Sequence, residues 1–266
     1  MKYQKFLLLF ALGTMPAAFG SVYVSDFSGA NVGDPLNGVD GWVQSYPNPT
    51  DDTNPLTWIN LLDGEKAGSI GAYYDEPTGD SYNVFRTVGG NVVGSTLTMD
   101  FGLMDSTNEY PDRNNFSISI LDGGFSEVFS LNFTATAQSY DPESNDHQWN
   151  VSWSSGGVTS APFAGVLEGG AYTYDVSFDL GLNENDDPAV VATLTISSDY
   201  NVWPTQTAVL SSVATNETFG ILKVTAEKGD TEEWGDDFLS FRGVVPEPGV
   251  AMLVLLSGVG LLRRRR

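Results

Sequence analysis

Cysteine is absent from this chain of 266 residues, and histidine occurs once, as His147. The first absence excludes a disulfide framework, a thiol nucleophile and a thiolate metal site. The second excludes a histidine-based metal cluster and leaves a catalytic triad with one candidate base. Because His147 lies in a polar loop and no nucleophile elbow is present, we interpret it as a bystander.

Basic residues are also scarce, since 12 Lys and Arg stand against 34 Asp and Glu. Half of the basic residues lie near the two ends: Lys2, Lys5, Arg263, Arg264, Arg265 and Arg266. The stretch between the ends holds 6 basic and 33 acidic side chains, which gives a net charge near −27. Such a charge repels nucleic acid and anionic lipid and attracts cations, so a nucleic-acid partner is excluded.

No apolar run reaches the ~20 residues that a membrane-spanning helix needs. Residues 1–20 begin with two lysines, continue with an apolar stretch at 6–12 and close on the small residues Ala17, Ala18 and Gly20. This order predicts a secretory signal peptide that is cleaved between Gly20 and Ser21. A membrane anchor or a buried N-terminal helix is the alternative.

The C-terminus has three parts in order: Pro246, Glu247 and Pro248, an apolar segment at 249–262, and four arginines. Arginines after an apolar segment stay in the cytoplasm while the preceding domain is exported by the secretion machinery. The apolar segment is short and contains two glycines, which predicts transient insertion into the inner membrane, with a permanent anchor as the alternative.

This tail resembles the PEP-CTERM sorting signal of exopolysaccharide-producing Gram-negative bacteria, on Pro246, Glu247, Pro248 and the arginines that follow. The resemblance implies that the enzyme exosortase recognises the motif, removes the tail and passes the protein to the cell surface or extracellular matrix. It covers only about the last 22 residues and concerns sorting. It implies nothing about what the central domain does.

Residues 21–245 alternate apolar and polar side chains in many short runs, which predicts β-strands with one buried face. The clearest runs are at 116–120, 129–134 and 172–180, and weaker ones are at 97–103, 149–153, 190–196, 219–226 and 238–244. Clusters of Gly, Asn, Asp and Pro separate them, and no helical stripe intervenes. We therefore predict one all-β domain, an antiparallel β-sandwich of the jelly-roll type, with two smaller domains as the alternative.

The first and last segments of this domain, at 26–42 and 235–241, resemble concanavalin-A-like (laminin-G and lectin) jelly rolls of exported bacterial proteins. The resemblance implies that the first and last strands pair, which would bring Asp26 close to Asp236 and Asp237. Clustered carboxylates suit calcium, so these residues form a candidate calcium site. Solvated acidic turns are the alternative interpretation.

Carboxylates are numerous enough for a glycosidase, but the Glu-x-Asp-x-x-Glu string of jelly-roll glucanases is absent. The nearest match, Glu233 with Asp236, has a spacing that puts the two side chains on opposite faces of a strand. Trp42, Trp58, Trp203 and Trp234 lie in or beside turn-rich stretches, where an exposed ring would stack on a sugar. They are the candidate ligand-binding residues.

Three functions follow for this domain. The leading one is a non-catalytic surface or matrix protein associated with extracellular polysaccharide. The second is a jelly-roll enzyme that degrades polysaccharide, which requires two carboxylates facing each other about 5–10 Å apart in a groove. The third is a structural or adhesive unit with calcium-stiffened loops.

Overall fold

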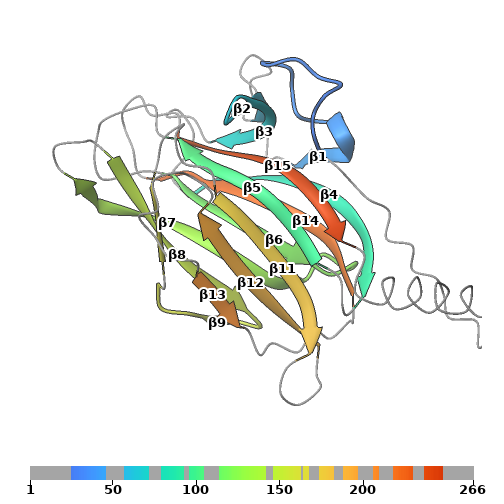
Figure 1. Ribbon diagram of the computed structural model, residues 1–266, viewed down its shortest axis with the longest axis vertical. Helices are drawn as coiled ribbons and strands as arrows, with labels where there is room; N and C mark the ends of the chain where they lie inside the picture. The colour runs from blue at the N-terminus through green and yellow to red at the C-terminus, as the bar shows by residue number, and fades with distance from the viewer. Residues whose placement is uncertain are drawn as a thin grey trace, which may run out of the picture.

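The computed structural model describes the ranges 25–45, 57–71, 79–92, 96–104, 114–141, 146–162, 164–167, 174–182, 188–196, 206–209, 218–229 and 237–247. Within them the chain forms β-strands and one 3₁₀ turn, η1 (Val39–Gly41). Figure 1 shows the strands arranged in two layers.

The first layer is an eight-stranded sheet in the order β1 (Trp42–Ser45), β4 (Ser81–Val92), β14 (Thr218–Glu227), β6 (Asn115–Leu121), β7 (Glu127–Asp141), β8 (Asp146–Ser155) and β10 (Ala164–Leu167), with β9 (Val158–Thr159) beside β8. The second is a seven-stranded sheet in the order β13 (Gln206–Val209), β12 (Pro188–Ile196), β11 (Tyr174–Leu182), β5 (Thr96–Met104), β15 (Phe238–Glu247), β3 (Glu65–Gly71) and β2 (Thr57–Leu62).

The core lies between the layers and is built by alternation along each strand. Phe116, Ile118 and Ile120 of β6 are at most 2% exposed, and the intervening serines face the other way. Aromatic rings join the two sheets, since Phe101 and Phe133 lie 5.0 Å apart and Phe129 and Phe178 lie 5.6 Å apart. The predicted all-β antiparallel sandwich is confirmed.

The expected pairing of the first and last strands is wrong. β1 pairs with β4, whereas β15 pairs with β3 and β5 in the other sheet. The segment before β1 does reach β15, because the Gly243 N–H donates to the Ser25 carbonyl at 3.0 Å. This contact lies towards the far end of β15 from Asp237.

Both predicted targeting segments, 1–20 and the tail from Pro248 onward, lie outside the described residues. β15 runs past Val245, and Pro246 and Glu247 align with Leu97 and Thr96 of β5. The predicted boundary between domain and tail therefore falls inside this strand. No helix within the described ranges has the length and apolar character to cross a membrane.

Candidate functional site

The outer face of the eight-stranded sheet, which points away from the core, carries small polar side chains on neighbouring strands. Because strands are in register, one line of such residues crosses β4, β14, β6, β7 and β8. We call this line the polar row; its members are Asn83, Thr225, Ser117, Asn132 and Ser152. Alternation places them there, since their neighbours along each strand fill the core.

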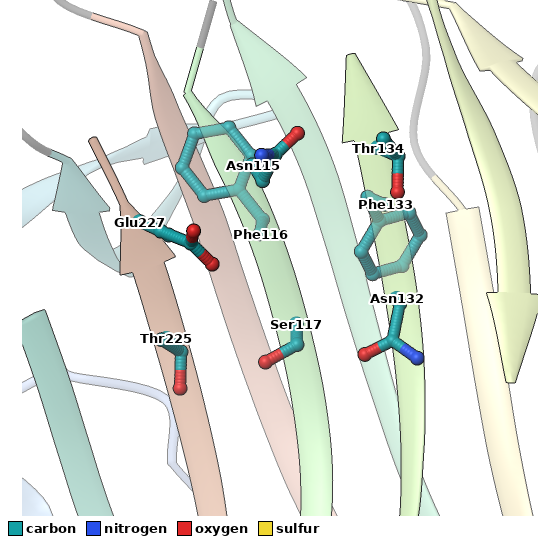
Figure 2. A pocket seen from close by; sticks show the side chains of 8 residues that line it. All are labelled: Asn115, Phe116, Ser117, Asn132, Phe133, Thr134, Thr225 and Glu227. Carbon is teal, nitrogen blue, oxygen red and sulfur yellow. The ribbon is translucent and has the colours of Figure 1, made fainter. Parts of the chain in front are cut away.

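A pocket of about 240 Å³ opens on this face where β6 begins and β14 ends. Figure 2 shows it between β14, β6 and β7, lined by Asn115, Phe116, Ser117, Asn132, Phe133, Thr134, Thr225 and Glu227. The two phenylalanines belong to the core, so the groups that face a ligand are hydroxyls, amides and one carboxylate. Among the described lining residues, Glu227 is the only acid.

Hydrogen bonds fix several of these side chains before any ligand arrives. Thr225 Oγ1 donates to Asn83 Oδ1 at 2.8 Å, and Asn132 Oδ1 accepts from Ser130 Oγ at 2.9 Å. Asn115 Oδ1 accepts the Ala135 N–H at 3.0 Å. Preorganised polar groups lose less entropy when they bind a ligand hydroxyl. The pocket is therefore built to accept and donate hydrogen bonds with little rearrangement.

An exposed aromatic residue lies at one end of the same face. The turn between β6 and β7, residues 122–126, carries Phe125, which is 65% exposed. Its ring meets Phe85 of β4 edge-on, with centroids 6.1 Å apart. We call residues 122–126 the aromatic turn. The face thus combines a polar row with an accessible aromatic surface, the two features that sugar rings contact.

The aromatic turn folds back over the sheet. The backbone of Gly123 lies only 3.4 Å from the position that a Cβ on Gly220 of β14 would occupy. Leu121 and Ile221, paired across β6 and β14, are buried yet lie outside the main core cluster. The turn therefore packs at van der Waals distance against β14, and Phe125 of the same turn contacts Phe85.

The Asp122 carboxylate holds the aromatic turn in shape. It is 6% exposed, and Oδ1 accepts the N–H of Gly124 at 2.7 Å and of Ser126 at 2.9 Å. Phe125 has φ +65°, a left-handed conformation that costs a residue with a Cβ about 1–2 kcal/mol. A glycine would fit that conformation better, so the ring is kept at an energetic cost.

We expect Asp122→Ala to lower the free energy of unfolding by about 2 kcal/mol, because two N–H groups lose their acceptor. Asp122→Asn is the matched control, since its amide oxygen still accepts both bonds, and it should lose less than half as much. Urea unfolding measures both variants. Equal losses would show that the carboxylate charge, and not the two hydrogen bonds, holds the turn.

Of the predicted ligand-binding tryptophans, the two that the structure describes, Trp42 and Trp58, do not form this site. Trp42 is fully buried, packs 4.7 Å from Phe241 and donates its indole N–H to Ser25 Oγ at 3.3 Å. Its prediction as a stacking ring is wrong, because a tryptophan at a strand start serves the core here. Trp58 is partly buried against Phe238, on β2 of the other sheet. Trp203 and Trp234 lie outside the described residues.

Of the candidate calcium residues, the two that the structure describes, Asp26 and Asp237, are not brought together. Asp26 is exposed and accepts the Ser28 N–H, which lowers its pKa. Asp237 immediately precedes β15. It lies six residues from Gly243, where the N-terminal segment attaches, or about 20 Å along a strand. Asp236 lies outside the described residues. Within those ranges no group of three or more acidic or histidine side chains could hold a metal ion.

Asp237 belongs instead to a buried polar cluster around Asn114. Asp237 Oδ2 accepts the Asn114 N–H at 2.9 Å, and Asn114 Nδ2 donates to the Asp237 carbonyl at 3.3 Å. Asn114 Oδ1 accepts the Gly229 N–H, and its carbonyl accepts the indole N–H of Trp149. Asn114 is 1% exposed, so one side chain ties the ends of strands from both sheets.

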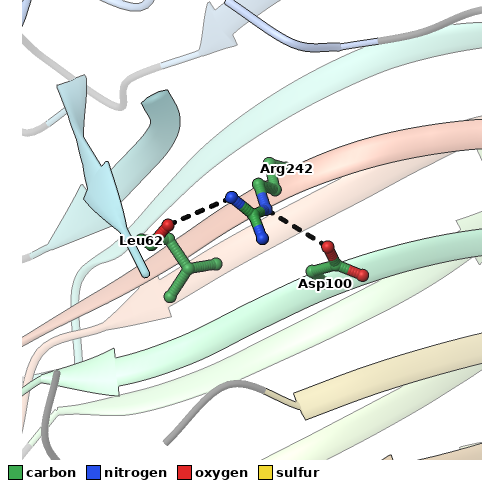
Figure 3. A network of polar contacts seen from close by, with 3 residues as sticks. All are labelled: Leu62, Asp100 and Arg242. Carbon is green, nitrogen blue, oxygen red and sulfur yellow. Dashed lines mark hydrogen bonds and ion pairs between the residues drawn. The ribbon is translucent and has the colours of Figure 1, made fainter. Parts of the chain in front are cut away.

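The outer face of the seven-stranded sheet holds a pair of carboxylates. Asp175 of β11 and Asp100 of β5 are cross-strand partners, and Arg242 of β15 is the next partner along. Figure 3 shows Arg242 between Asp100, 3.2 Å away, and the Leu62 carbonyl, 3.1 Å away. Burial, followed by a hydrogen bond and repulsion from Asp100, raises the pKa of Asp175 to about 6.

This pKa predicts a pH-dependent stability. A carboxyl whose folded pKa is raised from 3.8 to about 6 favours folding at low pH, and that contribution is lost as pH rises through 6. Because Asp175 is half exposed and screened, we expect a loss of about 1 kcal/mol. Asp175→Asn mimics the protonated form, so it should match the wild type at pH 4 and exceed it by that amount at pH 7.5.

Urea unfolding at the two pH values measures this difference. Asp179→Asn is the matched control, since it removes a carboxylate from the same face of β11. A gain of equal size at pH 7.5 in both variants would mean that general charge repulsion, and not the raised pKa of Asp175, is responsible.

No protein-family model and no curated protein matches the chain. Several solved structures are similar. They include the CBM2 module of an evolved Dit protein from Lactobacillus casei BL23 phage J-1, with a TM-score of 0.48 and 12% identity over 85% of this chain and 96% of that one. The lectin UEA-II complexed with galactose has a TM-score of 0.41 and 9% identity, over 81% of this chain and 97% of that one. The Emp47p carbohydrate recognition domain has a TM-score of 0.39 and 12% identity, over 80% of this chain and 94% of that one. At these identities the similarity concerns the fold alone.

Proposed function

We propose that this protein binds carbohydrate without cleaving it, and that an extended glycan lies across the outer face of the eight-stranded sheet. The observation that carries the proposal is the polar row, which crosses five neighbouring strands on the face that also carries the exposed ring of Phe125. The backbone of Phe125 has a strained, left-handed conformation. Neighbouring strands are about 4.8 Å apart, close to the length of one sugar ring. Successive residues of the row are therefore spaced to meet successive sugars.

The chemistry of the face suits sugars. Glycan hydroxyls need both donors and acceptors, which amides and hydroxyls supply, and the flat C–H face of a sugar ring packs on an aromatic ring. Of the described lining residues, Ser117, Thr134 and Glu227 make no hydrogen bond through their side chains, so their side-chain oxygens are available to a ligand. Apolar ligands would leave these groups unsatisfied.

A catalytic role is less well supported. Glycoside hydrolysis ordinarily uses two carboxyl groups at least about 5 Å apart, with the scissile bond between them. Among the described residues that line the pocket, Glu227 stands alone. The Asp100–Asp175 pair lies on the other sheet, where Asp100 is paired with Arg242, and neither residue lines the described pocket.

We also propose that the protein is exported by a Gram-negative bacterium and sorted by exosortase to the cell surface or matrix, where it meets extracellular polysaccharide. The ordered tail of Pro246, Glu247 and Pro248, an apolar segment and the four arginines supports this. Since Pro246 and Glu247 lie in register with β5, exosortase would act on the motif only after the end of β15 detaches.

The test is calorimetric titration of the purified protein with the producing organism's soluble exopolysaccharide, in calcium and in chelator, while newly formed reducing ends are assayed. Saturable binding without new reducing ends is the expected result. New reducing ends would establish the enzyme alternative. Binding lost only in chelator would establish a calcium site, and no binding would overturn the proposal.

A further inference from the structure

Lys223 of β14 holds an unusual place among the basic side chains of the central domain. There are six in residues 21–245: Lys66, Arg86, Arg113, Lys223, Lys228 and Arg242. Arg86 and Lys228 are buried, at 5% and 2% exposed. Lys66 bonds to the carbonyls of Ser28 and Ala30, and Arg242 pairs with Asp100. Arg113 lies outside the described residues.

Within the ranges that the structure describes, Lys223 is thus the one basic side chain that is partly exposed and has no hydrogen bond or ion pair. The domain is otherwise strongly acidic, so an unpaired ammonium group is locally distinctive. A lysine left without a carboxylate in such a protein is available to an anionic group from outside.

Its position adds a second observation. Lys223 is the cross-strand partner of Phe85 on one side and of Ser119 on the other. Cross-strand partners on one face have Cβ atoms about 5 Å apart. Because Phe125 contacts Phe85, the side chain of Lys223 starts beside the aromatic pair, two residues along β14 from Thr225 of the polar row.

The nearby carboxylates do not neutralise this lysine. Glu227 is four residues along β14, about 13 Å at strand spacing. Asp122 is bonded to the backbone of its own turn, and Glu127 accepts from Ser154 across the face. At 0.15 M salt the Debye length is about 8 Å, so the distant negative charges of the domain are largely screened at this point.

We propose that Lys223, Phe85 and Phe125 form a subsite for an acidic sugar, a uronic acid residue of the bound glycan. The ring stacks on the aromatic pair, and its carboxylate meets the Lys223 ammonium group. This inference rests on the proposed glycan-binding function and adds to it the chemical class of one sugar. It also explains why a strongly acidic domain keeps one unpaired cation on this face.

The test compares oligogalacturonate with the same oligosaccharide after carboxyl reduction, titrated at 0.15 M salt. We expect the wild type to bind the carboxylated form about fivefold more tightly, the size of one exposed ion pair. Lys223→Gln should bind both forms alike, and Lys223→Arg should keep the preference. The preference should shrink at 0.5 M salt.

Each outcome separates the two proposals. Equal binding of both forms by the wild type overturns the acidic subsite and leaves glycan binding standing. A preference that survives in Lys223→Gln overturns the role of Lys223. If the wild type binds neither oligogalacturonate nor its carboxyl-reduced form, nor any other neutral oligosaccharide, both proposals are overturned. Circular dichroism of each variant confirms that the sheet is intact, and Lys223→Arg keeps the test informative if the glutamine variant misfolds.

Discussion

Phe125→Gly is expected to weaken glycan binding at least tenfold, about 1.4 kcal/mol, while the protein stays about as stable as before. The ring is 65% exposed in the free protein, so its removal takes away a binding surface more than a part of the core. Glycine relieves the strain of φ +65°, which offsets the lost contact with Phe85. Calorimetric titration and thermal unfolding measure the two quantities separately.

The matched control is Asp63→Gly. Asp63 has φ +50° in the turn between β2 and β3, so glycine relieves similar strain in the other sheet. We expect this variant to gain about 1 kcal/mol of stability and to bind glycan as the wild type does. If Phe125→Gly bound as tightly as Asp63→Gly, the aromatic turn would have no part in recognition.

Asn114→Ala is expected to have the largest effect on stability, a loss of about 2–4 kcal/mol. The substitution leaves the Gly229 N–H and the Asp237 carbonyl without the side chain that pairs with them in the interior. For a domain of this size, such a loss lowers the melting temperature by roughly 6–12 °C. Thermal unfolding followed by circular dichroism measures the change.

Asn37→Ala is the matched control for this variant. Asn37 also accepts a backbone N–H, that of Gln44 at 3.2 Å, but it is exposed and water replaces the lost bond. Its melting temperature should fall by no more than about 2 °C. If the melting temperature of Asn114→Ala fell by a similarly small amount, the hydrogen bonds of the buried cluster would not be what holds the strand ends in place.

The sequence predicted the elements whose alternation is strict. The runs at 116–120 and 129–134 are β6 and β7, and the run at 97–103 is β5, with the expected faces buried. Strands β1 to β4 were missed because their pattern is broken. In β4 a buried Arg86 stands at a core position between Val84 and Val88, and two glycines follow.

The candidate site could not be predicted, for a different reason. Its residues are common serines, threonines and asparagines. Only the register that brings β4 and β14 beside the consecutive strands β6, β7 and β8 places them in one row. The sequence pattern favoured tryptophans as the ligand-binding residues, but Trp42 is a core residue. The one available signal was the string Asp122-Gly123-Gly124-Phe125, a tight turn that carries an aromatic ring.

The most direct test of glycan binding to this face is an amide NMR titration of the protein with an oligosaccharide prepared from the exopolysaccharide. We expect shifts confined to the outer face of β4, β14, β6, β7 and β8 and to the aromatic turn, with no new reducing ends. Shifts centred on Asp100 and Arg242 of the seven-stranded sheet, or cleavage of the oligosaccharide, would contradict the account.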